Sequence, residues 1–219
     1  MKKSRIAFVC SDCGSEYAKW QGQCHDCGVW NTLKQLNLGS AKASHRRDGF
    51  TGVIEEARTL DQVDVSSTLR IPTLSAEINR VLGGGLVPGS AILISGSPGA
   101  GKSTLLIQVL CELAQNYSAL YVTGEESLSQ IALRATRLKL PLDKVKVMSQ
   151  TAVEDISHTW DKLKPTILVI DSIQVMQSDS VESAPGSVTQ VRESAATLIQ
   201  KAKQTNTVLF LVGHVTKDG

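Results

Sequence analysis

Four cysteines near the start of the sequence have the residue type and spacing of metal ligands. Cys10 and Cys13 are separated by two residues, as are Cys24 and Cys27, and a glycine follows each pair. Two such pairs can bring four thiolates to the corners of a tetrahedron around Zn²⁺, and the glycine suits a tight turn with positive φ. Four cysteines leave no open coordination position, so the spacing predicts a structural zinc site and not a catalytic one.

The same cysteines allow a second interpretation, two disulfides, which a reducing compartment and the two-residue separations disfavour. His25 lies inside the second pair and is interpreted as an exposed spacer, not as a ligand. A module of about thirty residues depends on a metal contributing about 10 to 16 kcal/mol, because burial alone cannot stabilise it. We expect Tyr17, Trp20 and Trp30 to form its small core, with stacking on nucleic-acid bases as the alternative.

A glycine-rich stretch in the middle of the chain matches the phosphate-binding pattern G-x-x-x-x-G-K-[ST] at every required position. Glycines let the backbone fold around phosphates with its N–H groups pointing inward, and the following helix adds positive potential at its N-terminus. We expect the lysine to reach the β and γ phosphates of ATP, the serine to ligate Mg²⁺ and the next threonine to contact the α phosphate. The predicted nucleotide-binding residues of this loop are Gly96, Ser97, Pro98, Gly99, Ala100, Gly101, Lys102, Ser103 and Thr104.

Carboxylates follow two of the apolar runs that predict strands. Asp171 ends the run 166–170, as expected of a Walker B residue that supports Mg²⁺. Glu125 and Glu126 follow the run 119–123, at the edge of the sheet where ligands of open α/β folds bind. We expect Glu125, which is nearer the strand end, to polarise the attacking water. The alternative is an exposed acidic pair that caps the next helix, and the sequence does not decide between the two glutamates as the base.

One histidine also falls at this edge. His214 follows the apolar run 207–212, so it can sense the γ phosphate, or it can have a structural role. The predicted catalytic residues are therefore Glu125, Lys102 and His214.

Short apolar runs alternate with amphipathic stretches along the second part of the chain. The runs are interpreted as fully buried strands, at 91–95, 119–123, 145–148, 166–170 and 207–212. Segments of helical length and spacing lie at 102–115, 128–140, 153–163 and 188–204. Repeated βαβ units predict an α/β fold with a mostly parallel sheet and helices on both faces. Cys111, on the first of these helices, is expected to be a small buried residue.

Charge and composition divide the chain into three parts. The first fifty residues carry eight Lys and Arg against four Asp and Glu, which leaves 15 against 17 in the remainder. A basic front suits a polyanionic partner, and a solvated tail equally well. We expect a zinc ribbon at 1–36, a linker at 37–64 and an ATPase core at 65–219. The sequence has no apolar stretch long enough to span a bilayer, so we expect a cytoplasmic protein with no membrane partner.

Five segments, in this order, resemble the RadA/Sms family of bacterial DNA repair ATPases, which are RecA-like. They are the four-cysteine ribbon followed by VWNTL, then RVLGGGLVPGSAILISGSPGAGKSTLL, YVTGEES, LVIDSIQ and GHVTKDG. The resemblance covers nearly all 219 residues. It implies a RecA-like P-loop core that assembles as a homo-hexameric ring and translocates along single-stranded DNA using ATP. It also implies branch migration of recombination intermediates during repair, with the recombinase RecA as a partner.

The resemblance assigns roles to single residues as well. It implies that Lys102 and Ser103 are phosphate and metal groups and that Asp171 is the Walker B carboxylate. By similarity to RecA-type sites, Glu125 is the general base, and His214 is a switch that links nucleotide state to DNA-facing loops.

Two features depart from the family pattern. Ser97 and Ala100 stand where an acidic and a branched apolar residue are expected, but neither position must coordinate anything. Family members also continue past residue 219 with further strands and a Lon-protease-like domain, so the chain is interpreted as a fragment whose core is truncated. We expect poor solubility and weak ring formation of the isolated fragment, which can be inactive by itself.

The segment 173–187 is predicted to be a polar loop. In a RecA-like ring such a loop faces the central channel, so Arg192 and Lys217 are candidate contacts for DNA phosphates. The loop contains Asp179 and Glu182 and no basic residue, which leaves a mobile connector as the alternative.

Three functions fit these observations. The leading one is a DNA-dependent ATP hydrolase of the helicase type that acts as a single-stranded-DNA motor. The second is a KaiC-like regulatory ATPase that switches a protein partner without DNA, and its turnover would be indifferent to DNA. The third is a zinc adaptor with a purely structural nucleotide site, in which Lys102→Ala would change nothing.

Overall fold

The computed structural model describes residues 5–38, 57, 59–62 and 70–214. Most of the predicted linker 37–64 lies outside the described residues, as does Lys217. The boundaries expected between ribbon, linker and core therefore stay predictions.

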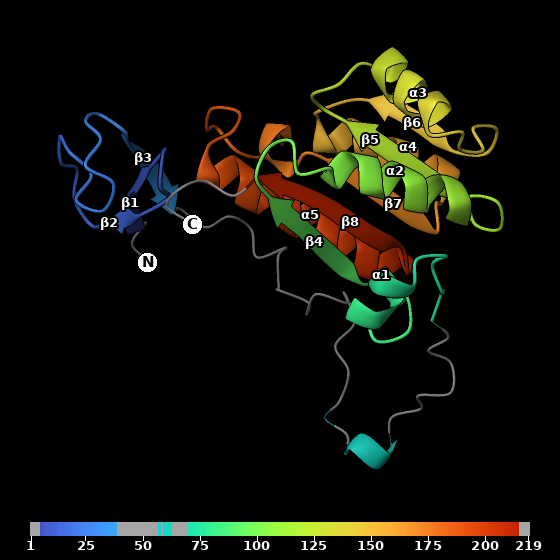
Figure 1. Cartoon of the computed structure of the whole chain (residues 1–219). Coiled ribbons are helices and arrows are strands. Elements are labelled where there is room, and N and C mark those ends of the chain that lie inside the picture. The colour runs from blue at the N-terminus through green and yellow to red at the C-terminus, as the bar shows by residue number, and fades with distance from the viewer. Residues whose placement is uncertain (1–4, 39–56, 58, 63–69, 215–219) are drawn as a thin grey trace.

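Three short strands build the N-terminal ribbon (Figure 1). They are β1 (Arg5–Cys10), β2 (Glu16–Tyr17) and β3 (Leu33–Leu38), paired antiparallel in the order β2-β1-β3. The core of this ribbon is small: Cys10, Cys24 and Leu33 are buried, and Phe8 and Tyr17 pack against them. Two of its three buried residues are cysteines, so the sulfur atoms themselves form much of the interior.

The expectation that both tryptophans fill this core was wrong. Trp20 is 57% exposed and Trp30 is 64% exposed. A Cβ atom placed on Gly22 would lie within 4.0 Å of both indole rings, so the two rings lie near each other on the surface of the ribbon. The sulfur cluster occupies the centre, and of the three expected aromatic rings only the half-buried ring of Tyr17 packs against it.

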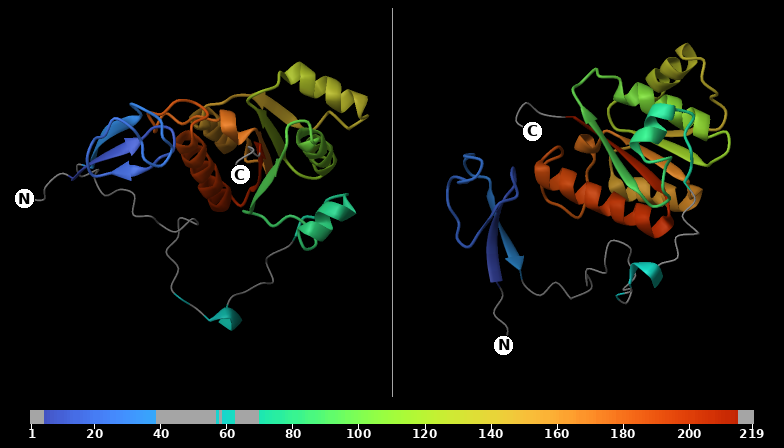
Figure 2. Two further views of the ribbon diagram at one scale, coloured as in Figure 1. Left: turned by 60° about the vertical axis from the view of Figure 1, so that its left-hand side comes forward. Right: turned by 60° about the horizontal axis from the view of Figure 1, so that its bottom comes forward.

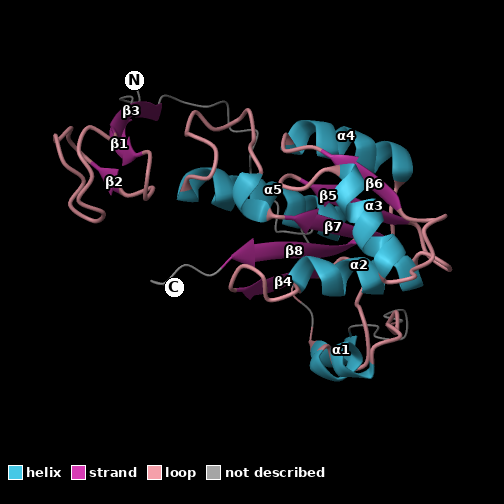
Figure 3. Ribbon diagram, turned by 45° about the horizontal axis from the view of Figure 1, so that its top comes forward, coloured by secondary structure: helices cyan, strands magenta, loops and turns pink. Residues whose placement is uncertain are grey.

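Five parallel strands form the sheet of the larger unit, in the order β4-β8-β7-β5-β6 (Figure 3). They are β4 (Ala91–Gly96), β5 (Ala119–Thr123), β6 (Lys146–Ser149), β7 (Ile167–Asp171) and β8 (Val208–His214). The three central strands are buried almost throughout, as expected of parallel strands covered on both faces.

Full burial was also expected of the two edge strands, and there the expectation was wrong. Leu93 on β4 is 64% exposed and Val147 on β6 is 38% exposed. Helices cover the middle of the sheet, so side chains of the outermost strands are only partly covered. The sequence pattern of an edge strand in a parallel sheet does not differ enough from that of a central strand to reveal this.

Helices cover both faces of the sheet, as predicted (Figures 1 and 3). One face carries α2 (Lys102–Leu113) and α3 (Leu128–Arg137), and α1 (Ala76–Val81) packs at its margin. The opposite face carries α4 (Val153–Leu163) and α5 (Val188–Thr205). Successive residues of one strand serve the two layers: Tyr121 packs with the α2 layer, whereas Leu120 and Val122 pack with the α4 and α5 layer.

The predicted elements agree closely with the observed ones. Strand β5 and helix α4 have the predicted bounds, and the ends of the other seven predicted elements differ by at most three residues, whereas α1 and η2 were not predicted. Cys111 is buried on α2 as expected, and its burial, with a smaller contribution from Glu112, raises the pKa of its thiol to about 11. No helix within the described residues is both long and apolar enough to cross a membrane.

The end of β5 lies against the turn that follows β7. This turn contains the short 3-10 helix η2 (Ile173–Val175). A Cβ atom placed on Gly124 would lie 2.3 Å from Cγ2 of Val175 and 3.0 Å from Cε of Met176. Only a glycine lets the two strand ends approach this closely.

We expect Gly124→Ala to destabilise the fold by about 1 to 3 kcal/mol, because the methyl group overpacks the contact with Val175. The free energy of unfolding in urea measures the change. Gly96→Ala is the matched control, because a Cβ there would meet only Cδ of Lys102, at an ordinary 3.8 Å. Equal stability of the two variants would contradict the close approach at Gly124.

Candidate functional site

The phosphate loop connects β4 to α2, and most of its residues have small side chains or none. Gly99 and Gly101 have φ of 78° and 86°, a left-handed conformation that glycine adopts without strain. Gly101 is the N-cap of α2 and supplies no side-chain acceptor to the first amides of the helix. These amides are therefore free to donate to an anion, and the helix dipole favours negative charge at this end.

Lys102 lies across the opening of this loop. Its side chain is buried, and Nζ donates to the carbonyl oxygens of Gly96 at 2.8 Å and Ser97 at 3.0 Å. Nζ also lies 3.3 Å from Nδ1 of His214. The only acceptors of this ammonium group within the described residues are two carbonyls and one imidazole, so no carboxylate neutralises it. Its positive charge is directed at the loop, where phosphate oxygens can be bound.

Asp171 is at the end of β7, where it is only 8% exposed. The hydroxyl group of Tyr121, from the neighbouring strand β5, donates a hydrogen bond to Oδ2 of Asp171. Burial, together with the charge of Asp171, raises the pKa of Tyr121 far above its usual range, so the hydroxyl stays a donor. This bond fixes the orientation of the carboxylate in the wall of the pocket.

The two glutamates after β5 have different surroundings. Glu125 accepts a hydrogen bond from the hydroxyl of Ser172, and its Oε1 lies 3.7 Å from Nε2 of His214. Oε1 of Glu126, in contrast, lies 2.6 Å from Nη2 of Arg134 on α3. Glu125 therefore lies beside Ser172 and His214, whereas Glu126 forms an ion pair with Arg134.

A cavity of about 310 Å³ joins these groups at the C-terminal edge of the sheet. Its lining residues are Pro98, Gly99, Gly101, Lys102, Ser103, Thr104, Thr123, Glu125, Glu126, Arg134, Asp171 and His214. Most of the predicted nucleotide-site residues are in this wall, while Gly96, Ser97 and Ala100 belong to the loop but are not in the lining. Their roles stay predictions, but the fold does bring these residue types together around one space.

Four neighbours of the cavity were not predicted from the sequence: Tyr121, Thr123, Arg134 and Ser172. Ser172 directly follows the predicted Walker B aspartate, which is a usable signal. No sequence signal indicated Arg134, because an arginine on a helix is usually interpreted as solvent-exposed.

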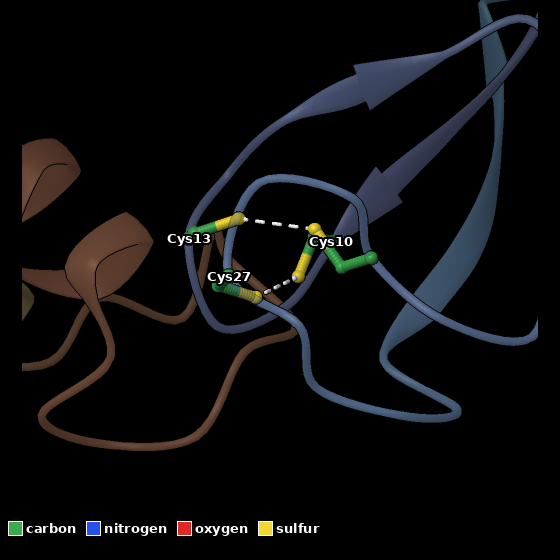
Figure 4. Close-up of side chains that lie close together, drawn as sticks. Cys10, Cys13 and Cys27 are labelled. Carbon is green, nitrogen blue, oxygen red and sulfur yellow. Dashed lines mark hydrogen bonds between the residues drawn. The ribbon is translucent and has the colours of Figure 1, made fainter.

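The four predicted metal ligands of the ribbon also converge. The Sγ atoms of Cys10 and Cys27 are 3.7 Å apart, and those of Cys13 and Cys24 are 3.4 Å apart. All four lie within 4.8 Å of one another, and Figure 4 shows the sulfur atoms of Cys10, Cys13 and Cys27 in this cluster. A tetrahedral Zn–S₄ site with bonds of about 2.3 Å has S–S edges of about 3.8 Å, so the donors and their spacing fit Zn²⁺.

One local contact favours the thiolate form of Cys24. The hydroxyl of Tyr17 lies 3.3 Å from Sγ of Cys24, and this hydrogen bond is the main cause that lowers the pKa of Cys24 to about 6. Gly14 and Gly28 have φ of 78° and 73°, as predicted for the two turns. The sulfur separations are far longer than the bond of about 2.05 Å in a disulfide, which disfavours that interpretation. His25 is not among the clustered groups.

The polar loop after η2 is held by a buried side chain. Gln190 on α5 is 3% exposed, and its Nε2 donates to the carbonyl oxygens of Val181 at 3.0 Å and Ser183 at 3.1 Å. The N-terminal ribbon lies beside this region (Figure 2). Nζ of Lys34 in the ribbon donates to the carbonyl oxygen of Glu182 at 3.2 Å. These contacts do not support the alternative of a mobile connector.

The two candidate DNA contacts near this loop remain predictions. Arg192 is exposed on α5, and a Cβ placed on Gly14 of the ribbon would lie 3.8 Å from its Nη1. Lys217 lies outside the described residues.

The hydrogen bond between Tyr121 and Asp171 has a measurable effect. We expect Tyr121→Phe to lower the free energy of unfolding by about 1.5 to 3 kcal/mol, because a buried carboxylate loses its donor. Tyr117→Phe is the control, because the hydroxyl of Tyr117 makes no hydrogen bond within the described residues. Urea unfolding of both variants makes the comparison, and equal losses would contradict the special role of the Tyr121 hydroxyl.

Two family models match this chain. Residues 56–219 match the family described as "AAA domain", and residues 8–35 match the "Rubredoxin metal binding domain". The first match contains the whole cavity at the sheet edge, and the second contains all four clustered cysteines.

The chain is also similar over its whole length to several curated proteins named DNA repair protein RadA. It is 53% identical to the one from Haemophilus influenzae, 52% identical to the one from Pseudomonas aeruginosa and 48% identical to the one from Escherichia coli. Each comparison covers 100% of this chain and 48% of the relative, so the chain spans about half the length of the curated relatives it matches. The chain therefore belongs to the AAA domain family, and over its whole length it matches the N-terminal part of proteins named DNA repair protein RadA.

Proposed function

We propose that this chain binds and hydrolyses ATP with Mg²⁺ and is the nucleotide-driven part of a DNA motor in recombinational repair. The observation that carries the proposal is the convergence of Lys102, Asp171 and Glu125 on one cavity, from three different strand ends. Phosphoryl transfer needs such a combination: a cation for the phosphates, a carboxylate for the metal and a group that orients water.

Each residue has a separate task in this proposal. The amides of the loop and Lys102 would bind the β and γ phosphates, and Ser103 and Asp171 would hold Mg²⁺. Mg²⁺ supplies charge neutralisation on the phosphates when it is bound. Glu125 orients the attacking water and accepts its proton, because it is the glutamate that no cation pairs closely.

His214 is proposed as the connection between the nucleotide and the rest of the molecule. It lies 3.3 Å from Nζ of Lys102 and 3.7 Å from Oε1 of Glu125. Its carbonyl oxygen accepts a hydrogen bond from Gln174 in the turn after β7. A change at the γ phosphate can therefore displace the end of β8 and this turn together.

The DNA partner rests on the relatives alone. Their shared name, DNA repair protein RadA, supports DNA as the partner. Single-stranded or branched DNA, the recombinase RecA and a homo-hexameric ring are further parts of the proposal, which rest on the family resemblance of the sequence. Arg192 is exposed on α5 near the ribbon and stays a candidate for DNA contact, as does Lys217.

A regulatory ATPase that switches a protein partner without DNA is the second candidate. The same cavity serves it equally well, since nucleotide chemistry does not depend on what the energy drives. ATP turnover that does not respond to DNA would favour it.

We expect Glu125→Gln to reduce ATP turnover at least a hundredfold while ATP binding is retained, because a general base contributes about 10²- to 10⁴-fold. Lys102→Ala is expected to lose binding as well. Turnover is measured with and without single-stranded DNA, and the motor proposal predicts stimulation by DNA. Unchanged turnover in Glu125→Gln would remove this residue from the mechanism.

The cysteine cluster is proposed to bind one Zn²⁺ per chain. We expect Cys24→Ser to lose most of the metal and His25→Ala to keep it, because only the cysteine belongs to the sulfur cluster. Elemental analysis of both purified variants measures the zinc content. Equal zinc loss in the two variants would contradict the proposed ligand set.

A further inference from the structure

An ion pair in the wall of the nucleotide cavity has no role in the mechanism above. Oε1 of Glu126 and Nη2 of Arg134 are 2.6 Å apart, and the two side chains are 33% and 20% exposed. Glu126 is also fixed through its backbone: its N–H donates to Oγ1 of Thr123 at 3.0 Å, and its carbonyl oxygen accepts from the same hydroxyl at 3.1 Å. This pair is therefore held in place more firmly than an exposed surface ion pair.

The two atoms of the pair that do not contact each other are buried and lack hydrogen-bond partners within the described residues. Oε2 of Glu126 and Nη1 of Arg134 have no hydrogen-bond partner within the described part of the chain, although both atoms are inaccessible. Buried polar atoms in proteins nearly always have a partner, either protein or ordered water. Both residues line the nucleotide cavity, but these two atoms are closed to it, so the contact between Oε1 and Nη2 is the interaction that holds each charge.

The charges around the cavity give the pair a task. Three carboxylates line it, Glu125, Glu126 and Asp171, and its proposed ligand is itself strongly negative. Lys102 and Arg134 are the cations in the same wall. Without Arg134, Glu126 would be an uncompensated negative charge beside the phosphates and would compete with Glu125 for the same water or metal.

We propose that Arg134 is a positioning residue that neutralises Glu126 and thereby separates the roles of two consecutive glutamates in the nucleotide site. The ion pair holds Glu126 away from the reacting water, and Glu125 alone acts on it. This inference rests on the proposed nucleotide site and adds to it the residue that decides between Glu125 and Glu126.

The test compares binding of a fluorescent ATP analogue without Mg²⁺ across four variants. Arg134→Ala is expected to weaken binding about tenfold, because it leaves Glu126 as an uncompensated negative charge in the wall of the nucleotide cavity. Glu126→Gln is expected to tighten binding, since Arg134 is then an uncompensated cation. The double variant Arg134→Ala with Glu126→Gln is expected to bind within about twofold of the unsubstituted chain. Arg137→Ala is the matched control, because Arg137 is an exposed arginine on the same helix.

Saturating Mg²⁺ supplies a second readout. The metal screens the carboxylates, so the difference between Arg134→Ala and the unsubstituted chain is expected to shrink when Mg²⁺ is present. Thermal unfolding verifies that each variant folds. If Arg134→Ala does not fold, Glu126→Gln alone tests the inference. Tighter binding by Glu126→Gln supports it, and weaker binding contradicts it, because the loss of a structural contact would not tighten binding.

Two results would overturn the inference. If the double variant binds as weakly as Arg134→Ala, Arg134 contacts the nucleotide itself and does not act through Glu126. If Arg134→Ala and Glu126→Gln both bind like the Arg137→Ala control, the pair is structural only. Failure of the unsubstituted chain to bind the analogue would instead remove the proposed function, and this inference with it.

Discussion

Parallel pairing of neighbouring strands is the constraint on which the candidate nucleotide site depends. Gly96 pairs with His214 across β4 and β8, and Thr123 pairs with Asp171 across β5 and β7. Residues that are far apart in the sequence thus reach one edge of the sheet at the same height. A shift of one residue in either pairing would turn the side chains of that strand to the opposite face, and the cavity would lose His214 or Asp171.

The ribbon and the sheet domain are stabilised in different ways. The sheet is covered by helices on both faces and has two extensive apolar clusters. The ribbon buries only three residues within the described part of the chain, two of them cysteines, and leaves both tryptophans exposed. A metal ion held by four thiolates would replace the missing apolar core, because its binding free energy becomes folding free energy.

Much of this architecture follows from local sequence signals, and the remainder depends on tertiary neighbours. The phosphate loop, Asp171 and the two glutamates could be placed because each directly follows an apolar run. The exposure of Leu93 could not, because it depends on β4 lying at the edge of the sheet. The pairing of Arg134 with Glu126 likewise depends on how α3 packs after β5, and no local pattern encodes that contact.

The central claim is that the loop amides and Lys102 bind a triphosphate while the opposite carboxylates support its metal. A crystal structure of the chain with a nonhydrolysable ATP analogue and Mg²⁺ tests it most directly. We expect the β and γ phosphates within hydrogen-bonding distance of the amides of residues 99–103. We expect Mg²⁺ near the hydroxyl of Ser103 and the carboxylate of Asp171. An analogue bound elsewhere, or a loop with no phosphate at saturating concentration, would contradict the account.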